Sequence, residues 1–199
     1  MKKIGIILMF CMLCGVALGQ PARSVLDKVS AVISNKGGVS ANFKISSSSY
    51  GNANGKIYIK GRQFHATTAS AIIWFNGKTQ WTYMKHNNEV NVNNPTEAEL
   101  QAINPYNFIN MYRSGFSYGM KTIGGNYQVH LKATKKSRQI QEMYILVNKS
   151  TYVPSQIKMR QGSRWSTITI SNFKKANLSN SIFRFNSKDY PKAELIDLR

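Results

Sequence analysis

The chain has 199 residues and a formal net charge of +19 at pH 7, from 27 basic and 8 acidic residues. That length is enough for one domain with its own hydrophobic core. Such a basic excess is typical of proteins that bind nucleic acid, anionic membranes or acidic glycans, although excess lysine also simply keeps a surface solvated. Both cysteines, Cys11 and Cys14, lie in the leader described next. The remaining chain has no thiol, which excludes a disulfide framework, a metal-thiolate site and a cysteine nucleophile.

The first nineteen residues have the pattern of a secretory signal peptide. Lys2 and Lys3 precede the apolar run IGIILMFCMLCGVALG, which at about 16 residues is shorter than the roughly 20 that span a bilayer. Small residues near its end predict cleavage between Gly19 and Gln20, with a single mature domain over residues 20–199. Loss of the two lysines lowers the charge to +17. Export from the cytoplasm favours membrane head groups, lipopolysaccharide or acidic glycans over nucleic acid as anionic partners.

Residues 22–34 predict an amphipathic helix, because their apolar side chains recur with a 3.6-residue period. These side chains are Val25, Leu26, Val29, Val32 and Ile33. Gly37 and Gly38 are expected to end the helix. The pattern then changes to period two with β-branched and aromatic residues, which predicts short strands near residues 40–49, 55–60, 63–75, 78–84 and 88–93.

The stretch WFNGKTQWTY, residues 74–83, predicts a β-hairpin around Asn76 and Gly77. A two-residue type I′ turn needs positive φ at both central positions, which Asn-Gly tolerates best. Such a turn pairs Trp74 with Thr79. Because side chains alternate between the two faces of a hairpin, one face is strongly apolar. It consists of Ile72, Trp74, Trp81 and Tyr83.

Two predicted helix starts interrupt the strand pattern. In NNPTEAEL, Asn94 is the predicted N-cap and Pro95 the first helical residue, and in NPYNFINMYRSG, Asn104 and Pro105 take the same places. The second segment is apolar over most of its circumference, so it must be buried against something. Strands resume at residues 126–134, 140–147, 153–161 and 165–171. Consecutive hairpins with so few helices favour one curled sheet or barrel.

Little in the sequence points to catalysis or metal binding. His65, His86 and His130 are scattered over different predicted strands and hairpin ends, with no spacing that places two on one metal. The acidic pair Glu97 and Glu99 lies in a predicted helix start, where the helix dipole accounts for it. The chain has no Gly-x-Ser-x-Gly motif, no phosphate-binding loop and no zinc-ligand spacing. We therefore expect a protein that is not an enzyme and that uses no cofactor or metal.

A series of motifs in the same order resembles the LolA-like outer-membrane lipoprotein carriers. These motifs are LDKVSAVIS followed by VSANFKI, then GKIYIKGRQF, FNGKTQWTY, NPYNFIN, IFRF and the tail YPKAELIDLR. The resemblance implies a mostly β (α+β) fold, in which one strongly curved antiparallel sheet forms an unclosed β-barrel with a helical lid over a hydrophobic cavity. It also implies a monomeric periplasmic carrier. Such a carrier takes the acyl chains of lipoproteins from an inner-membrane transporter to an outer-membrane acceptor.

The expected binding site has a wall, a lid and a latch. The wall combines the apolar hairpin face with pliant apolar residues of later strands, and consists of Ile72, Trp74, Trp81, Tyr83, Met143, Ile145, Ile157 and Met159. The lid is the apolar helical segment with Phe108, Ile109, Met111 and Tyr112. The resemblance implies a lid-holding arginine in a Lys-Arg-Pro segment. Here Lys60-Gly61-Arg62 displaces the arginine by one position, so Arg62 is the candidate latch only if a bulge restores its direction.

Three alternatives remain open at this level. The opposite face of any of these strands is an equally available lining. The fold also suits a carrier of another lipid or glycolipid, or a sensor of mislocalised lipoproteins. A non-lipidic module that holds acidic glycans with aromatic and basic side chains is the third. For a carrier of acyl chains, the basic surface is expected to assist docking at anionic head groups.

Overall fold

The computed structural model describes residues 19–47, 51–96, 99–100 and 111–199. A sheet of 12 strands dominates this part of the chain. The helices are α1 (Gly19–Ile33) and two 3-10 turns, η1 (Asn180–Phe183) and η2 (Ser187–Asp189). The strands are β1 (Val39–Ser47), β2 (Gly51–Lys60), β3 (Gln63–Thr68), β4 (Ala71–Phe75), β5 (Gln80–Met84), β6 (Glu89–Asn93), β7 (Phe116–Ile123), β8 (Asn126–Ala133), β9 (Glu142–Asn148), β10 (Pro154–Gln161), β11 (Arg164–Lys175) and β12 (Glu194–Asp197).

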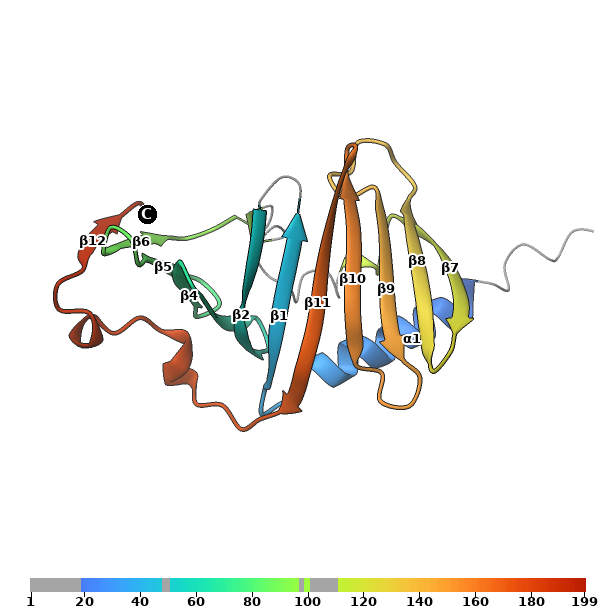
Figure 1. The fold of residues 1–199 in the computed structure, drawn as a ribbon, viewed down its shortest axis with the longest axis horizontal. Coiled ribbons are helices and arrows are strands. Elements are labelled where there is room, and N and C mark those ends of the chain that lie inside the picture. Colours follow the sequence, from blue (N-terminus) through green and yellow to red (C-terminus); the bar gives the residue numbers. More distant parts are fainter. Residues whose placement is uncertain (1–18, 48–50, 97–98, 101–110) are drawn as a thin grey trace, which may run out of the picture.

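Strand β1 lies in the middle of the sheet, between β2 and β11 (Figure 1). The order is β12-β6-β5-β4-β3-β2-β1-β11-β10-β9-β8-β7, so hairpins step outward from this centre on both sides. Neighbouring strands are antiparallel except β12, which runs parallel to β6. Within the described residues β12 and β7 are free edges, and the curved sheet is unclosed. The predicted mostly β fold with one curved, unclosed sheet is confirmed.

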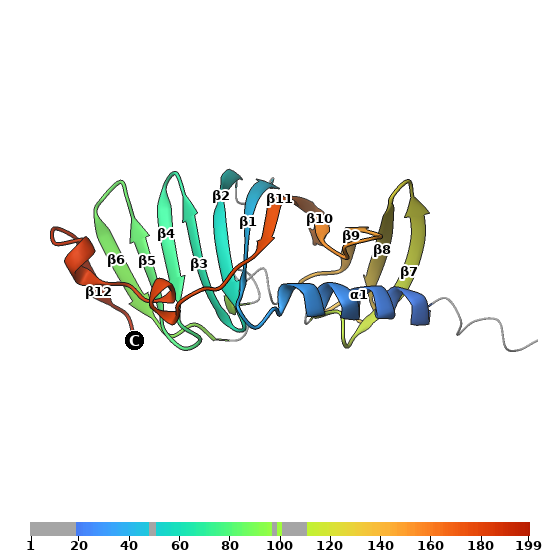
Figure 2. The same cartoon turned by 90° about the horizontal axis from the view of Figure 1, so that it is seen from below.

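Helix α1 packs on the inner face of the half of the sheet that ends at β7 (Figure 2). Of the predicted stripe, Val32 is half-buried and the other four residues are buried. They share one hydrophobic core with inward residues of β8 and β9, among them Leu131 and Met143. The helix ends at Ile33, and the following turn uses Gly38 at φ +94°, a conformation that favours glycine. No helix in the described ranges has the length and apolar content to cross a membrane.

The C-terminal segment, residues 179–199, crosses the outer face of β3 to β6, in front of these strands in Figure 2. Phe185 and Tyr190 of this segment contact the Trp74 ring edge-on, with centroids 5.5 and 5.6 Å away. Tyr190 also lies 4.7 Å from the Tyr83 ring. Phe183 is fully buried. Two of the aromatic side chains of the hairpin at residues 74–83, Trp74 and Tyr83, therefore pack against the chain's own C-terminal segment.

The hairpin around residues 76–79 has a different register from the predicted one. Trp74 pairs with Trp81, not with Thr79. The side chain of Asn76 accepts hydrogen bonds from the backbone N–H groups of Lys78 and Thr79, at 2.9 and 2.8 Å, and this widens the loop to four residues. The observed register differs from the predicted one by two residues, an even number, so the predicted set Ile72, Trp74, Trp81 and Tyr83 still shares one face.

Three further elements differ from the sequence predictions. The expected strand 63–75 is two strands, because Thr68 bonds through its hydroxyl to the backbone of Ala71 and closes a turn. Strand β7 was not predicted, since it carries glycine and lysine and lies at the sheet edge. The N-cap expected at Asn94 is Thr96, whose hydroxyl accepts from the Glu99 N–H while the Glu99 carboxylate accepts from the Thr96 N–H. A capping box satisfies two N–H groups and outcompetes a single cap.

Candidate functional site

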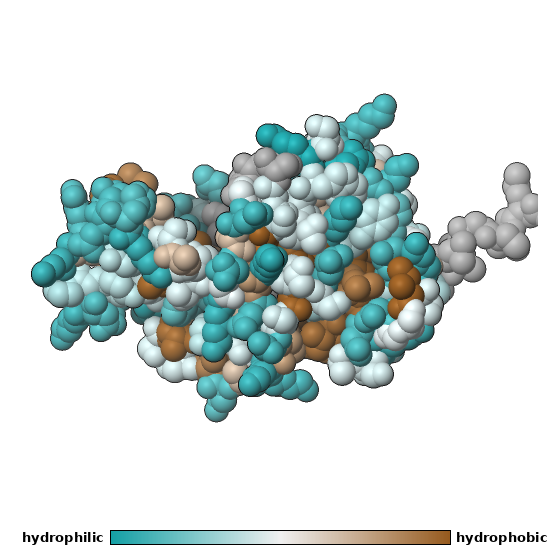
Figure 3. Space-filling view, in the orientation of Figure 1, coloured by the Kyte–Doolittle hydropathy of each residue, from teal (hydrophilic) through white to brown (hydrophobic). Residues whose placement is uncertain are grey.

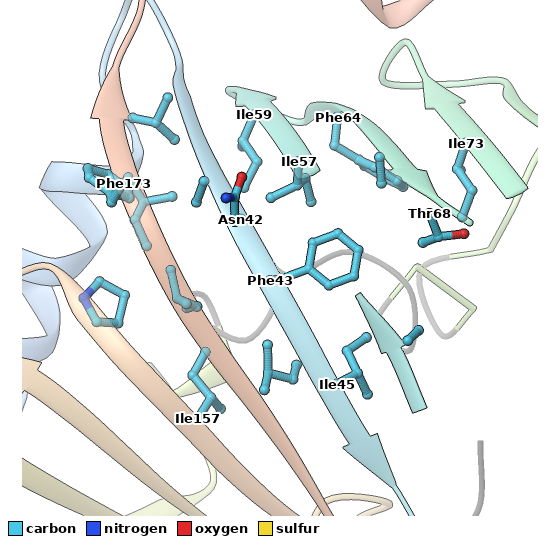
Figure 4. Close-up of a pocket in the computed structure, with 18 residues that line it drawn as sticks. Asn42, Phe43, Ile45, Ile57, Ile59, Phe64, Thr68, Ile73, Ile157 and Phe173 are labelled. Atoms are coloured by element: carbon cyan, nitrogen blue, oxygen red, sulfur yellow. The ribbon is translucent and has the colours of Figure 1, made fainter. Parts of the chain in front are cut away.

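An apolar pocket of about 300 Å³ lies on the inner face of β1 to β4, β10 and β11, at the lower end of the usual range for ligand pockets. Its lining is almost wholly apolar, with Asn42 and Thr68 the polar residues (Figure 4). The lining consists of Ile33, Val39, Ala41, Asn42, Phe43, Ile45, Ala53, Ile57, Ile59, Phe64, Ala66, Thr68, Ile73, Pro154, Ile157, Ile168, Ile170 and Phe173.

Strand alternation explains why these residues meet. Positions two apart in a strand share a face, and the pairing continues that face from strand to strand. Ile57 on β2 stands beside Ala66 on β3, which stands beside Ile73 on β4. On the other side of the centre, Ile45 on β1 stands beside Ile168 on β11. The registers therefore build one continuous apolar wall from several short strands.

A glycine shapes the middle of this wall. Phe43 on β1 stands directly opposite Gly55 on β2 and projects into the middle of the pocket (Figure 4). A Cβ atom at Gly55 would lie 2.0 Å from the carbonyl oxygen of Thr67 and 3.0 Å from the Phe43 Cζ. No ordinary side chain fits there without a shift of the β3 backbone. The glycine lets β2 and β3 approach closely and leaves the ring its place.

The pocket begins where α1 ends. Under α1 the inner face is filled, whereas Ile33 at the helix terminus already lines the pocket. Beyond it, large apolar lining residues keep part of their surface exposed in the described structure: Phe43, Ile45, Ile73, Ile168, Ile170 and Phe173. Half-exposed side chains of this size on a concave face are typical of a surface that a ligand covers.

The apolar wall stops at β4. On β5 and β6 the same face carries polar residues, because Ile73 is followed across the sheet by Thr82 and Asn91. Gln80 is buried on this face and donates from Nε2 to the Thr82 hydroxyl at 3.1 Å. Its Oε1 has no hydrogen-bond partner within the described structure. The concave face is thus apolar near the sheet centre and polar toward β6.

The eight residues of the predicted wall fall into three places. Ile157 lines the pocket. Met143, Ile145 and Met159 share its inner face but lie in the core with α1. The four hairpin residues, Ile72, Trp74, Trp81 and Tyr83, point to the outer face, and the pocket takes Ile73 from between them. The alternative left open above, the opposite face of the strand, is the one that lines the pocket.

Of the predicted lid residues, Phe108 and Ile109 lie outside the described residues. Met111 packs against the core, and Tyr112 is 1 % exposed. The Tyr112 hydroxyl donates to the Asp27 carboxylate on α1 at 2.5 Å. Burial, together with that carboxylate, raises the pKa of Tyr112 to about 12. Tyr112 is therefore fastened to the core rather than exposed at a surface.

Arg62, the candidate latch, lies in the tight turn between β2 and β3, where Gly61 has φ +57°. Its side chain is exposed. Because the turn interrupts strand alternation, the one-residue displacement of the arginine does not by itself turn its side chain to the other face of the sheet. A role in holding a lid stays a prediction.

The pocket residues that the sequence analysis missed come mainly from β1, β2 and β11. Their signal was present in VSANFKI and GKIYIKGRQF, where apolar side chains alternate within each strand, as in Phe43 and Ile45 or Ile57 and Ile59. These motifs carried the family resemblance, whereas the predicted wall followed the aromatic residues of the hairpin.

The residues that line the pocket include no titratable side chain. No group of three or more His, Asp or Glu side chains in the described part of the chain has the arrangement of a metal site. His65 stacks on Trp74 with centroids 5.4 Å apart, and burial lowers its pKa. His130 lies 2.9 Å from Glu142 on the outer face. Neither histidine reaches the pocket, so the pocket offers apolar binding without acid–base groups.

Comparisons with known proteins agree with this architecture. The structure is similar to an uncharacterised conserved protein from Thermus thermophilus, with a TM-score of 0.61, 14% sequence identity and coverage of 89% of this chain and 99% of that one. A LolA superfamily protein from Nitrosomonas europaea gives a TM-score of 0.44 at 14% identity, covering 82% and 97% of the two chains. A putative outer membrane lipoprotein-sorting protein domain from Vibrio parahaemolyticus gives 0.47 at 8%, covering 83% and 97%.

Of these three structures, the first is similar enough to support the fold. No curated protein matches this chain in sequence. The family model described as outer membrane lipoprotein carrier protein LolA matches residues 16–163, well over half of the chain. The chain belongs to the LolA family of outer membrane lipoprotein carriers, as a divergent member.

Proposed function

We propose that this protein binds acyl chains in the pocket at the sheet centre and carries lipoproteins, or another acylated molecule, through the periplasm. The single observation that carries the proposal is the lining, in which Asn42 and Thr68 are the polar residues among eighteen. Membership of a lipoprotein carrier family supports it. The lack of charged lining residues counts against acidic glycans as the pocket's ligand.

Acyl chains provide the driving force for such binding. Each buried methylene contributes about 0.8 kcal/mol, and a single fatty chain binds a membrane with only about 10⁴ M⁻¹. The free energy of an acylated molecule therefore changes little when its chain moves from a bilayer to an apolar protein surface. The half-exposed lining residues Phe43, Ile168 and Ile170 supply surface that an acyl chain would remove from water. Exchange in both directions is what a carrier needs.

The transport steps around this binding event are part of the proposal. The leader, which lies outside the described residues, would direct the protein to the periplasm. Family membership supports an inner-membrane lipoprotein-releasing transporter as donor and an outer-membrane acceptor as recipient. We propose a binding protein without catalytic activity. Native mass spectrometry of protein purified from membranes identifies which acylated molecule it carries.

A matched pair of neighbouring substitutions tests acyl binding. Ile168→Glu places a carboxylate on the pocket wall, whereas Thr169→Glu places the same charge on the outer face of the same strand. Ile168→Glu should weaken binding of a fluorescent fatty-acid probe at least about tenfold, because an acyl chain cannot satisfy a charge buried beside it. Thr169→Glu should change it less than about twofold.

Thermal unfolding of both variants provides the control for folding. Both carboxylates have access to water in the free protein, so both variants should unfold cooperatively. Equal probe affinities for a folded Ile168→Glu and the wild type would contradict acyl binding in this pocket.

A further inference from the structure

The outer face of the sheet, away from α1, is strongly basic across β7 to β11, β1 and β2. The cationic side chains that strand register places there include Lys44, Lys56, Lys121, Lys132, Lys158 and Arg160. We call these residues the outer basic face. The five lysines are exposed, and Figure 3 shows hydrophilic residues spread over this side of the molecule, with hydrophobic ones between them. Glu142 is the one carboxylate that the described strands place among them.

That carboxylate is already occupied. Arg160 contacts Glu142 Oε2 from its guanidinium at 3.0 Å, and His130 lies 2.9 Å from Oε1. The Tyr144 hydroxyl donates to the same Oε1 at 2.9 Å. Glu142 therefore neutralises Arg160 and leaves the charge of the lysines available to a partner.

Aromatic rings lie between these cations. His130 stacks on Tyr144 with centroids 4.3 Å apart and planes 4° apart, and Tyr144 lies 6.0 Å from Trp165. Lys158 Nζ stands 4.7 Å from the Trp165 ring centroid, and Arg160 covers the same ring at 5.8 Å. Half-buried tyrosine and tryptophan beside lysine are the side chains favoured at the head-group level of a bilayer. Because these rings contact one another and the Lys158 and Arg160 cations, less of their surface is left for stacking on a sugar.

We propose that the outer basic face docks the protein on an anionic phospholipid bilayer. Charge complementarity favours this partner, because the basic surface extends over seven adjacent strands and its one carboxylate is neutralised. Aromatic side chains of the kind found at membrane interfaces lie at its centre. The proposal goes beyond acyl binding, because the pocket lies on the opposite side of the sheet. Docking in this way retains the protein at a membrane while the pocket side, with α1, faces away from it.

Vesicle co-sedimentation tests the proposal. The wild type should bind phosphatidylcholine vesicles that contain phosphatidylglycerol, should not bind phosphatidylcholine alone, and should lose binding as salt rises. A variant with Lys44→Gln, Lys121→Gln, Lys132→Gln and Lys158→Gln should bind the anionic vesicles more than about 100-fold more weakly, since each lysine near such a surface contributes about fivefold.

A charge-matched variant distinguishes binding through the outer basic face from attraction by the net charge of the protein. Lys36→Gln, Lys78→Gln, Lys188→Gln and Lys192→Gln remove the same charge from exposed positions in turns and in the C-terminal segment. This control should lose less than about fivefold. The fluorescence of Trp165 should shift to the blue on vesicle binding, and Trp165→Phe should abolish that shift.

Several outcomes would overturn the proposal. Equal loss in the two lysine variants would show that net charge alone attracts the vesicles. Tight binding to heparin or RNA without vesicle binding would identify a soluble polyanion as the partner. Both variants should keep full affinity for the fatty-acid probe in the absence of vesicles. If the wild type does not bind the fatty-acid probe at all, that result contradicts acyl binding in the pocket and leaves the docking proposal unaffected.

Discussion

Tyr112 connects the chain before β7 to helix α1. Its ring is buried in the core, its hydroxyl donates to Asp27, and its backbone carbonyl accepts from the Tyr118 hydroxyl. A buried phenol bonded to a carboxylate resists ionisation, because the phenolate would face both a dry environment and a negative neighbour. Tyr112 thus joins α1 through its hydroxyl and β7 through its backbone carbonyl, and the bond to α1 is sensitive to alkaline pH.

Alkaline titration tests this role. An unfolded tyrosine ionises near pH 10, whereas folded Tyr112 stays protonated to about 12. The contribution of Tyr112 to the free energy of unfolding is therefore complete below pH 10 and lost as pH rises from 10 to 12. Tyr112→Phe should cost about 1.5–3 kcal/mol at neutral pH and should flatten the alkaline decline in urea unfolding. If Tyr112→Phe declines as steeply as the matched variant Tyr58→Phe, the assignment is wrong.

The C-terminal segment determines which face of β3 to β6 is covered and which is left open. It covers the outer face with Phe183, Phe185 and Tyr190, and the outward residues Val90 and Val92 are buried. Because this face is apolar and covered, the polar residues of β5 and β6 fall on the concave side. The segment also supplies β12, which extends the sheet by a parallel pairing with β6.

Removing the Phe185 and Tyr190 rings, which cover the outer face of the sheet, should destabilise the protein without affecting the pocket. Phe185→Ala combined with Tyr190→Ala should lower the free energy of unfolding by about 2–5 kcal/mol, from lost burial and lost ring contacts. Affinity for the fatty-acid probe should stay unchanged, because the pocket lies on the other face. Leu195→Ala, at a position 57% exposed, is the control and should cost less than about 1 kcal/mol. Loss of probe binding at a temperature where the double variant is folded would contradict this separation.

At the scale of the whole molecule, one sheet serves two purposes. The half from β7 to β10 is filled by α1 and forms a closed core, whereas the half around β1 to β4 keeps an apolar pocket. Strands β1 and β11, paired over most of their length, join the two. In the proposed function, this division lets a ligand enter the pocket without rearranging the packing under α1.

Hydrogen exchange measures this division. Backbone amides of β8 and β9 should exchange slowly with or without ligand, because their inward side chains are already buried. Amides of β2 and β3 should gain protection when a fatty acid is added, since the ligand stabilises only the folded pocket. Equal gains in both halves would indicate a global effect and contradict a division between core and pocket.

Local patterns made much of the fold predictable. The stripe from Val25 to Ile33 predicts α1, and alternation predicts most strands, because both depend on spacing within one segment. Strand β7 escaped prediction, since an edge strand with lysine and glycine has weak alternation. The hairpin register failed at Asn76, where a side chain bonded to the backbone lengthened the loop. Turn chemistry of that kind is decided by a few competing hydrogen bonds.

By itself the sequence determined the fold class, the family, the helix and, for many strands, the division into an apolar and a polar side. Only the tertiary structure decided which side faces the pocket. Trp74 and Ile73 are adjacent and both apolar, so alternation cannot rank them. Trp74 faces outward because Phe185 and Tyr190, more than a hundred residues later, cover it, and Ile73 is left to line the cavity. Burial depends on which distant segment arrives, and no local period encodes that.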